Sequence, residues 1–367
     1  MKQFFPSTLS RYLARIYTVN FCGLLLVLLG IIYLFDTVEL LRRGTKHEDI
    51  SLFLIFQMGL YKLPEVGQMV LPFAVLFSAI LTFWHLTRRH ELVVVRAAGL
   101  SVWQFLGPII GVGLLIGVLQ ITVINPLGAL SLARFESLES SYLKRQESLV
   151  SLSQQGLWLR QSTEGDGYVI LHASGVKMPE WVLQNTISLF FSNQDTFLRR
   201  IDAKEAVLAP GEWKFRHATV NAPHNLPEEA DLISLATNLT AQEIEDSFAS
   251  AETIPFWRLR AFISTMEATG FNATSLKIHF QRLLAQPLMF AAMILLAASV
   301  SLRPPRLRGT AMLVIIGVVI GFIVFFISSF LQALGASGQL PPVLAAWSPP
   351  AICFLLGVGA MMTLEDG

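Results

Sequence analysis

Long apolar runs free of Asp, Glu, Lys and Arg alternate with polar segments along this chain of 367 residues. Three runs precede a polar middle stretch and three follow it: Ile16–Phe35, Val66–Thr87, Trp103–Ile124, Leu283–Leu302, Thr310–Leu334 and Val343–Met362. Each run has about the ~20 residues that a helix needs to cross a bilayer. A helix that is apolar all round fits lipid better than a soluble surface. We therefore predict a membrane α-helical protein with six transmembrane helices, three plus three.

The polar middle stretch, residues 148–253, changes to a pattern typical of β-strands. Short alternating segments are separated by Gly, Asn, Asp and Pro, at Leu157–Leu159, Tyr168–Leu171, Ile187–Phe191, Phe197–Ile201, Ala206–Leu208, Trp213–Val220 and Leu232–Leu235. Ala209–Glu212 contains Pro and Gly and predicts a hairpin turn. The pattern favours an inserted all-β domain, a sandwich, barrel or jelly roll.

The predicted organisation has three parts. Residues 1–147 hold the first three transmembrane helices, and residues 148–253 form the β-domain. Residues 254–367 begin with a connector helix, about Pro255–Gly270, and continue into the last three transmembrane helices. Within the fifth run, the Gly317-x-x-x-Gly321 motif favours close packing between helices.

The distribution of charge predicts how the chain crosses the membrane. Hydrophobic residues make up 53% and charged residues 14% of the sequence, so the net charge of +1 matters less than its placement. Arginines gather in segments on one side of the six runs: Arg11, Arg15, Arg88, Arg89, Arg96, Arg303, Arg306 and Arg308. The positive-inside rule places these segments and both termini in the cytoplasm, and the β-domain on the opposite side. Arg42, Arg43, Lys46 and Lys62 depart from this trend.

Two features of the apolar runs have alternative interpretations. The first run resembles a cleavable signal peptide in composition, but no small-x-small cleavage site follows it, which favours a retained helix. Cys22 and Cys353 both lie in apolar runs and the β-domain contains no cysteine, so no disulfide framework is predicted.

The sequence carries no motif for catalysis, nucleotide binding or a metal or other cofactor. A Walker sequence and G-x-S-x-G are both absent, and Val94 stands where a zinc-protease motif starting at His90-Glu91 needs histidine. The apolar runs are nearly devoid of ionisable residues, with His85 at the end of the second run. Proton- and ion-driven carriers need such residues as relays, so an external energy source is favoured.

Residues 86–98, between the second and third runs, predict a short amphipathic helix that stops at Gly99. One interpretation is a solvated loop whose arginines only set the topology. The other is a coupling helix in a groove of a partner ATPase, with Glu91 as a fixed anion for a partner arginine and the Leu/Val face buried against the partner. The candidate coupling residues are Arg88, Arg89, Glu91, Leu92, Val95 and Arg96.

Residues 88–99, R-R-H-E-L-V-V-V-R-A-A-G, resemble the segment after the second span in the lipopolysaccharide export permeases, the LptF/LptG family. S-Q-Q-G-L-W at 153–158 is similar to the start of the periplasmic domain in the LptG branch, and L-F-D at 34–36 to the end of the first span. The family order is also three spans, a periplasmic β-jelly roll and three spans. The resemblance therefore covers nearly the whole chain.

The resemblance implies a permease subunit of an ATP-driven exporter in the bacterial inner membrane. Such subunits extract lipopolysaccharide and pass it to a periplasmic bridge toward the outer membrane. The implied partners are a paralogous LptF-like permease subunit, a cytoplasmic LptB-like ABC ATPase dimer, a single-span LptC-like protein and an LptA-like bridge protein. ATP hydrolysis is then expected on the separate ATPase rather than on this chain, and no nucleic acid partner is implied.

The resemblance also implies a substrate-binding site near the end of the first span. Asp36, Arg42 and Arg43 correspond to an Asp and a basic pair there, and guanidinium groups suit the phosphates of a lipid A-like headgroup. The alternative is an ordinary basic pair beside the membrane. Several family members carry Lys where this chain has Tyr33, so the headgroup contacts are expected to differ at that position.

Two other functions stay open at this point. One is a non-transporting membrane scaffold for a periplasmic assembly, which the charged helix at 86–98 argues against. The other is a permease of another lipid or lipoprotein ABC exporter. Permeases of the lipoprotein-release type insert their large domain after the first span, which the span order here argues against.

Overall fold

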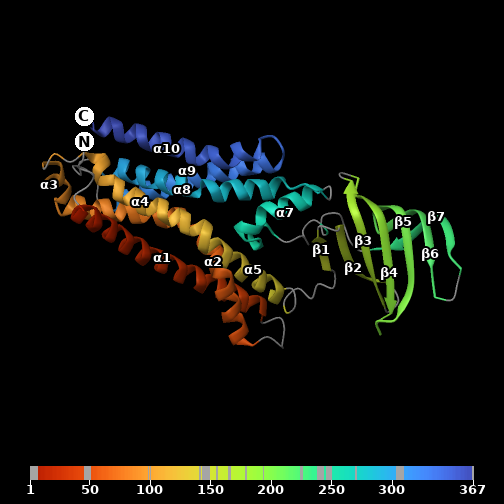
Figure 1. Ribbon diagram of the computed structural model, residues 1–367. Helices are drawn as coiled ribbons and strands as arrows, with labels where there is room; N and C mark the ends of the chain where they lie inside the picture. The colour runs from red at the N-terminus through yellow and green to blue at the C-terminus, as the bar shows by residue number, and fades with distance from the viewer. Residues whose placement is uncertain are drawn as a thin grey trace. The chain divides into compact units, whose positions relative to one another are not determined.

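Two compact units make up the chain in a computed structural model, shown in Figure 1. The helical unit comprises residues 1–136, 255–257 and 274–367, and the β unit comprises residues 137–254 and 258–273. The residues that the structure describes are 7–44, 51–97, 99, 101–139, 142, 149–153, 156–163, 167–177, 180–192, 194–223, 226–237, 244, 250–268, 271–302 and 310–365.

The helical unit confirms the six predicted spans. Six helical stretches in the described residues are long and apolar enough to cross a membrane, by length and composition. The helices are α1 (Ser7–Gly44), α2 (Leu52–Arg88), α3 (Glu91–Ala97), α4 (Val102–Leu119), α5 (Asn125–Glu139), α8 (Thr274–Ser301), α9 (Thr310–Ala336) and α10 (Pro342–Glu365). A π-helical stretch, Gln120–Ile124, joins α4 to α5 without a break. The short η3 (Ala251–Thr253) and most of α7 (Phe256–Ala268) belong to the β unit, and α7 lies within the stretch expected to be a connector helix.

Several helices extend beyond the apolar runs that predict them. α2 begins at Leu52 rather than Val66, and α8 begins at Thr274 rather than Leu283. The added turns carry charge, including Lys62 in α2 and Arg282 in α8. The helices therefore include ionisable residues that a count over the apolar runs alone leaves out.

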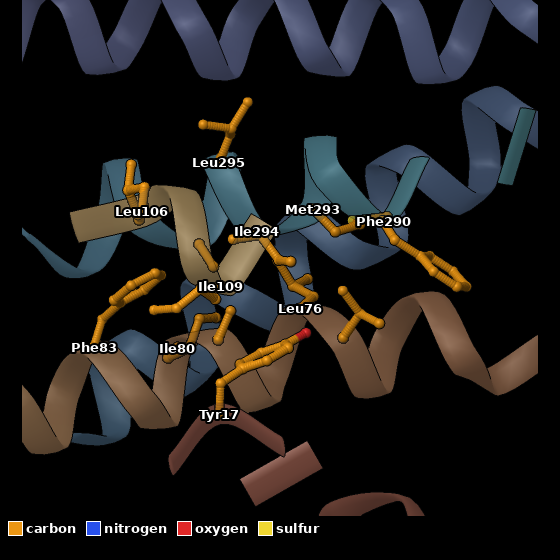
Figure 2. Close-up of a cluster of buried hydrophobic side chains, with 14 of the residues drawn as sticks. Tyr17, Leu76, Ile80, Phe83, Leu106, Ile109, Phe290, Met293, Ile294 and Leu295 are labelled. Atoms are coloured by element: carbon orange, nitrogen blue, oxygen red, sulfur yellow. The ribbon is translucent and has the colours of Figure 1, made fainter. Parts of the chain in front are cut away.

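The core of the helical unit lies where α2, α4 and α8 meet (Figure 2). In the most apolar 18-residue stretch of each helix, 67% of α8 is buried inside the protein but only 6% of α1. The side chains drawn and labelled in Figure 2 come from four helices: Tyr17, Leu76, Ile80, Phe83, Leu106, Ile109, Phe290, Met293, Ile294 and Leu295. α8 is thus the central helix, and α1 contributes to the core mainly through Leu13, Tyr17 and Phe21.

Glycines allow neighbouring helices to approach closely. A Cβ at Gly117 of α4 would lie 2.5 Å from Cα of Pro287 in α8. A Cβ at Gly317 of α9 would lie 2.6 Å from Cδ1 of Ile80, and one at Gly321 would lie 3.1 Å from the Phe73 ring. The close packing predicted for the Gly317-x-x-x-Gly321 motif is therefore confirmed, and it joins α9 to α2.

The β unit confirms the inserted all-β domain. Its strands in the described residues are β1 (Leu149–Ser153), β2 (Gly156–Thr163), β3 (Gly167–Lys177), β4 (Val182–Ser192), β5 (Phe197–Ala209), β6 (Glu212–Asn221) and β7 (Glu228–Ala236). They form one antiparallel sheet in sequential order, β1 to β7. Two stretches predicted as separate, Phe197–Ile201 and Ala206–Leu208, belong to the single strand β5.

The connections explain this simple order. The predicted turn at Ala209–Glu212 is confirmed, with Gly211 at φ 81° and Ala209 paired to Glu212 across it. A strand that follows so tight a turn pairs with its predecessor. The described strands therefore form an up-and-down sheet, whereas a two-layer jelly roll would place non-consecutive strands side by side.

A line across five strands interrupts the alternation of the sheet. The residues along it are left out of the ladders on both sides: Ser174, Asn185, Lys204, His217 and Asp231. Asn185 and His217 lie there at φ 47° and 52°, a conformation uncommon for residues other than glycine. Along a regular strand every second residue is buried, but on either side of this line the nearest buried residues of a strand are three positions apart, as Ala203 and Ala206 are in β5. We call this line the crease; it shifts the buried side chains by one residue in each strand.

The contact between α4 and α8 yields a stability prediction. Gly117→Ala should lower the thermal unfolding temperature of the purified protein, because the new methyl group meets the Pro287 backbone, and overpacking typically costs about 1–3 kcal/mol. Gly111→Ala is the matched control, since its Cβ would meet nothing within 4 Å and alanine is the better helix former. Equal unfolding temperatures for the two variants would show that the close approach does not matter.

Candidate functional site

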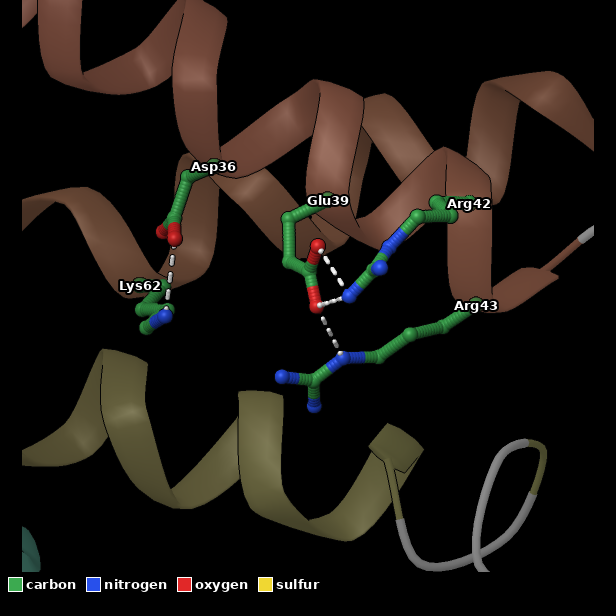
Figure 3. A network of polar contacts seen from close by, with 5 residues as sticks. All are labelled: Asp36, Glu39, Arg42, Arg43 and Lys62. Atoms are coloured by element: carbon green, nitrogen blue, oxygen red, sulfur yellow. Dashed lines mark hydrogen bonds and ion pairs between the residues drawn. The ribbon is translucent and has the colours of Figure 1, made fainter.

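Charged side chains gather on the last turns of α1. Asp36, Glu39 and Arg43 recur at helical spacing, so they lie along one face of the helix, with Arg42 beside them. Lys62 of α2 completes the group, as Figure 3 shows. We call these five residues the α1 cluster. The structure therefore brings together the three residues predicted as substrate-binding, Asp36, Arg42 and Arg43.

The α1 cluster has a sheltered part in which α1 is tied to α2. Lys62 Nζ lies 2.9 Å from Asp36 Oδ1, and the two side chains are only 31% and 21% exposed. The same ammonium group lies 5.7 Å from the centre of the Phe135 ring of α5. Partial burial weakens solvent screening, so this ion pair holds its geometry better than an exposed pair does.

The exposed part of the α1 cluster is organised by Glu39. Arg42 Nη2 lies 2.9 Å from both carboxylate oxygens of Glu39, and Arg43 Nε donates to Oε1 at 2.9 Å. The Arg42 and Arg43 side chains are 76% and 53% exposed. Glu39 thus holds two guanidinium groups side by side at the surface, an arrangement suited to an anion with several oxygen atoms.

The sequence interpretation missed two members of the α1 cluster. Glu39 could have been found from its spacing, because it precedes Arg42 and Arg43 by three and four residues on a helix. Lys62 stood out only as a basic residue on the unexpected side, and nothing in the sequence links it to Asp36. Tyr33 donates its hydroxyl to the Phe56 carbonyl at 3.2 Å. The cation beside Asp36 therefore comes from α2 rather than from position 33 of α1.

The predicted helix between the second and third spans is present as α3. α2 ends at Arg88, and His90 at φ 59° separates it from α3. α3 then runs from Glu91 to Ala97, and Gly99 at φ 77° follows as the predicted stop. Because His90 interrupts the helical path, α3 is a separate short element rather than an extension of α2.

The side chains of α3 correct one expectation. Leu92 and Val95 were expected to bury against a partner protein, but Leu92 is 9% exposed inside the core of this chain and Val95 packs against that core. Val94 points outward, at 68% exposed. Arg88 lies over the Trp84 ring at 5.2 Å, and Arg89 forms the C-cap of α2. The side chain of Arg96 lies outside the described residues.

Glu91 contacts the other end of α1. The hydroxyl of Tyr12 donates to Glu91 Oε2 at 2.9 Å and Oε1 at 3.1 Å. Tyr12 is 40% exposed, so this contact lies at the edge of the helical unit. The predicted fixed anion of α3 is therefore held in place by a residue that sequence reasoning did not find, 79 positions away.

The two candidate sites, the α1 cluster and α3, carry side chains suited to binding a charged partner rather than to breaking a covalent bond. The α1 cluster offers paired guanidinium groups, and α3 offers a carboxylate beside an exposed valine. In the part of the chain that the structure describes, no three His, Cys, Asp or Glu residues gather in a way that could hold a metal ion. Six apolar helices, with an all-β domain inserted in the sequence between the third and the fourth, are features of a membrane permease.

Comparison with known proteins identifies the family. The profile of the lipopolysaccharide export system permeases LptF/LptG matches residues 11–363, so the chain belongs to this family. It is 25% identical over 324 residues to the lipopolysaccharide export system permease protein LptG of Escherichia coli strain K12, covering 83% of this chain and 85% of that protein. It is 22% identical over 362 residues to LptG of Haemophilus influenzae, covering 95% and 97%.

The α1 cluster yields a prediction about lipid binding. Arg42→Glu combined with Arg43→Glu should reduce the lipopolysaccharide crosslinked to the assembled complex far more than either single Ala change, because new carboxylates repel an anionic headgroup. Subunit assembly and basal ATPase activity should persist, since both side chains are mostly exposed.

A control variant separates lipid binding from the internal ion pairs. Glu39→Gln removes the acceptor charge that holds both arginines but leaves their charges in place. It should therefore retain or increase the amount of crosslinked lipid. Equal lipid recovery from wild type and the double Glu variant would mean that the arginines are only surface charges.

Proposed function

We propose that this chain is the LptG-type permease subunit of an ATP-driven lipopolysaccharide exporter. The observation that carries the proposal is the match to the family over nearly the whole chain, together with polar contacts to neighbouring helices at both ends of α1. Tyr12 and Asp36 are 24 residues apart on one helix, or about 36 Å at 1.5 Å per residue. That length exceeds the ~30 Å of a hydrocarbon core, so the two groups belong to opposite membrane surfaces.

The proposed orientation places α3 and both termini in the cytoplasm. The α1 cluster and the β unit then face the periplasm, as the distribution of arginines favours. In this orientation Arg42 and Arg43 lie at the depth of lipid headgroups in the outer leaflet. Their exposed guanidinium groups would meet the phosphates of lipid A there.

The proposed partners supply what this chain lacks in the family's transport cycle. An LptB-like ABC ATPase dimer would bind at α3, and an LptF-like permease subunit would complete a shared cavity. The exposed apolar side of α1 and of α9, which includes Phe322, Phe326 and Phe330, suits contact with lipid or with that second subunit. An LptC-like single-span protein and an LptA-like bridge protein would then receive the lipid from the β unit.

The β unit would receive the expelled lipid, and its sheet has a filled apolar core. Large side chains are fully buried on one face of the sheet, among them Leu157, Leu171, Trp213 and Phe215. Closure of the ATPase dimer would narrow the shared cavity and drive the lipid toward this unit. Copurification from native membranes, with mass spectrometry of the bound proteins and lipids, tests the proposal. Recovery of periplasmic scaffold proteins without an ATPase would instead favour the non-transporting role.

The proposed orientation predicts the result of reporter fusions. A reporter placed after Gly367, or within residues 86–98, should be active only as a cytoplasmic fusion, and one within residues 160–245 only as a periplasmic fusion. The physical reason is the clustering of arginine at one set of span ends. A periplasmic C-terminus would overturn the whole arrangement.

The role proposed for α3 predicts an uncoupled phenotype. Glu91→Lys should leave the protein folded in the membrane and lower the lipid-stimulated ATPase activity of the complex by about tenfold, the size expected for one lost charge-assisted hydrogen bond. Glu91→Ala should have a smaller effect in the same direction. Glu180→Lys makes the same charge change at an exposed turn of the β unit and serves as the control. Wild-type ATPase activity in the Glu91→Lys variant would mean that α3 serves only to set the membrane topology.

A further inference from the structure

We propose that Tyr12 is a positioning residue that ties α1 to α3 through Glu91, so that a displacement of α3 is passed to α1. The inference rests on the proposed function, because it takes α3 as the element that the ATPase moves. It adds a route by which that movement reaches the α1 cluster. The residues that carry it are Tyr12, Glu91 and the stretch of α1 between Tyr12 and Asp36.

The hydrogen bond joins two elements that are distant in sequence. Tyr12 Oη donates to both carboxylate oxygens of Glu91, at 2.9 and 3.1 Å, and Glu91 lies in the first turn of α3. A carboxylate has about four lone-pair positions, so Glu91 keeps room for an arginine of a partner protein. The same side chain therefore suits both the contact with the ATPase and the contact with α1.

The link to α1 matters because the link to α2 is interrupted. α2 and α3 are consecutive, but Arg89 and His90 between them are not helical, and His90 lies at φ 59°. Such a break lets α3 turn relative to the axis of α2. Movement of α3 then reaches the helical bundle through side-chain contacts. One of these is the hydrogen bond from Tyr12 to Glu91, which is directional and charge-assisted.

The packing of α1 suits a helix that moves as one body. Its first half is held in the core by Leu13, Tyr17 and Phe21, which are at most 6% exposed. None of residues 22–36, all of which the structure describes, is buried within this chain. A Cβ at Gly23 or Gly30 would meet nothing within 4 Å. Because a helix is stiff along its axis, a shift at Tyr12 is carried along α1 toward Asp36. Between these two residues α1 is tied to α2 by hydrogen bonds from Asn20 to Thr82 and from Tyr33 to the Phe56 carbonyl, so α2 shares in the shift.

The test uses the full complex with its partners in lipid nanodiscs. Tyr12→Phe keeps the ring and removes only the hydroxyl. It should leave copurification of the ATPase and the KM for ATP unchanged but lower the lipid released per ATP hydrolysed by about tenfold, as for one charge-assisted bond. Combined with Glu91→Ala, it should be no worse than Glu91→Ala alone, because each of the two changes removes the hydrogen bond between Tyr12 and Glu91.

Movement of α1 is measured directly through a cysteine placed beyond the apolar run of the helix. Val38→Cys, at a position 67% exposed, takes a thiol-reactive fluorophore in a Cys22→Ser background with cysteine-free partners, since Cys353 is buried. ATP should change the fluorescence in this protein and not after the further change Tyr12→Phe. Thr18→Val is the matched control, because the Thr18 hydroxyl donates to the Ala14 carbonyl of its own helix, at 2.8 Å. It should behave as the protein without the Tyr12 change.

The outcomes separate this inference from the proposed function. A wild-type release ratio and fluorescence change in Tyr12→Phe, with a defect in Glu91→Lys, overturns the link to α1 and leaves the proposed function standing. Loss of ATPase binding in Tyr12→Phe also overturns it, because Tyr12 would then only support the shape of α3. Normal behaviour of all Glu91 variants overturns the coupling role of α3 itself.

Discussion

Close packing around α8 is the constraint on which the helical unit depends. In a bilayer the lipid tails are as apolar as the helices, so association relies on the fit of side chains and on small residues that let backbones approach. Gly117 lets α4 reach the Pro287 backbone of α8, and a Cβ at Gly357 of α10 would lie 2.7 Å from Leu295 of α8. α8 is therefore fixed from several sides. α1 and α9 keep large exposed apolar surfaces. Both candidate sites involve α1, through Tyr12 at one end and the α1 cluster at the other.

The six helices could be predicted from hydropathy because a bilayer leaves few alternatives to a helix for an apolar run of that length. The ends of these helices could not be predicted in this way. The helical hydrogen-bond ladder continues past the apolar run wherever neighbouring helices shield the polar residues, and hydropathy does not register this. In α8 the added turns hold His279 and Arg282, with Arg282 Nη1 donating to Gln332 Oε1 of α9 at 3.3 Å. The expectation that the spans are nearly free of ionisable groups thus holds for the apolar runs and not for the helices.

In the inserted domain and the charged clusters, too, some features could be predicted from the sequence and others could not. Strand positions and the turn at Gly211 follow from local sequence, but the crease does not. Asn185 and His217 adopt left-handed backbone conformations because the ladders on both sides fix them, although neither residue is a glycine. The resemblance supplied Asp36, Arg42 and Arg43 of the α1 cluster. Lys62 of the cluster and Tyr12 at the other end of α1 make their contacts across helices. Such partners are set by tertiary packing and have no local signal in one sequence.

The charges of the α1 cluster bear on how a lipid would be selected. Three cations, Arg42, Arg43 and Lys62, face two carboxylates, Asp36 and Glu39, which leaves an excess of only one positive charge (3 − 2 = +1). A single phosphate gains little from so small an excess and must compete with Glu39 for the guanidinium groups. A headgroup with several phosphates can engage both arginines at once and offset the loss of their bonds to Glu39. The internal carboxylate would therefore disfavour ordinary phospholipids more than a lipid A-like headgroup, so that specificity arises from a difference between affinities rather than from strong attraction.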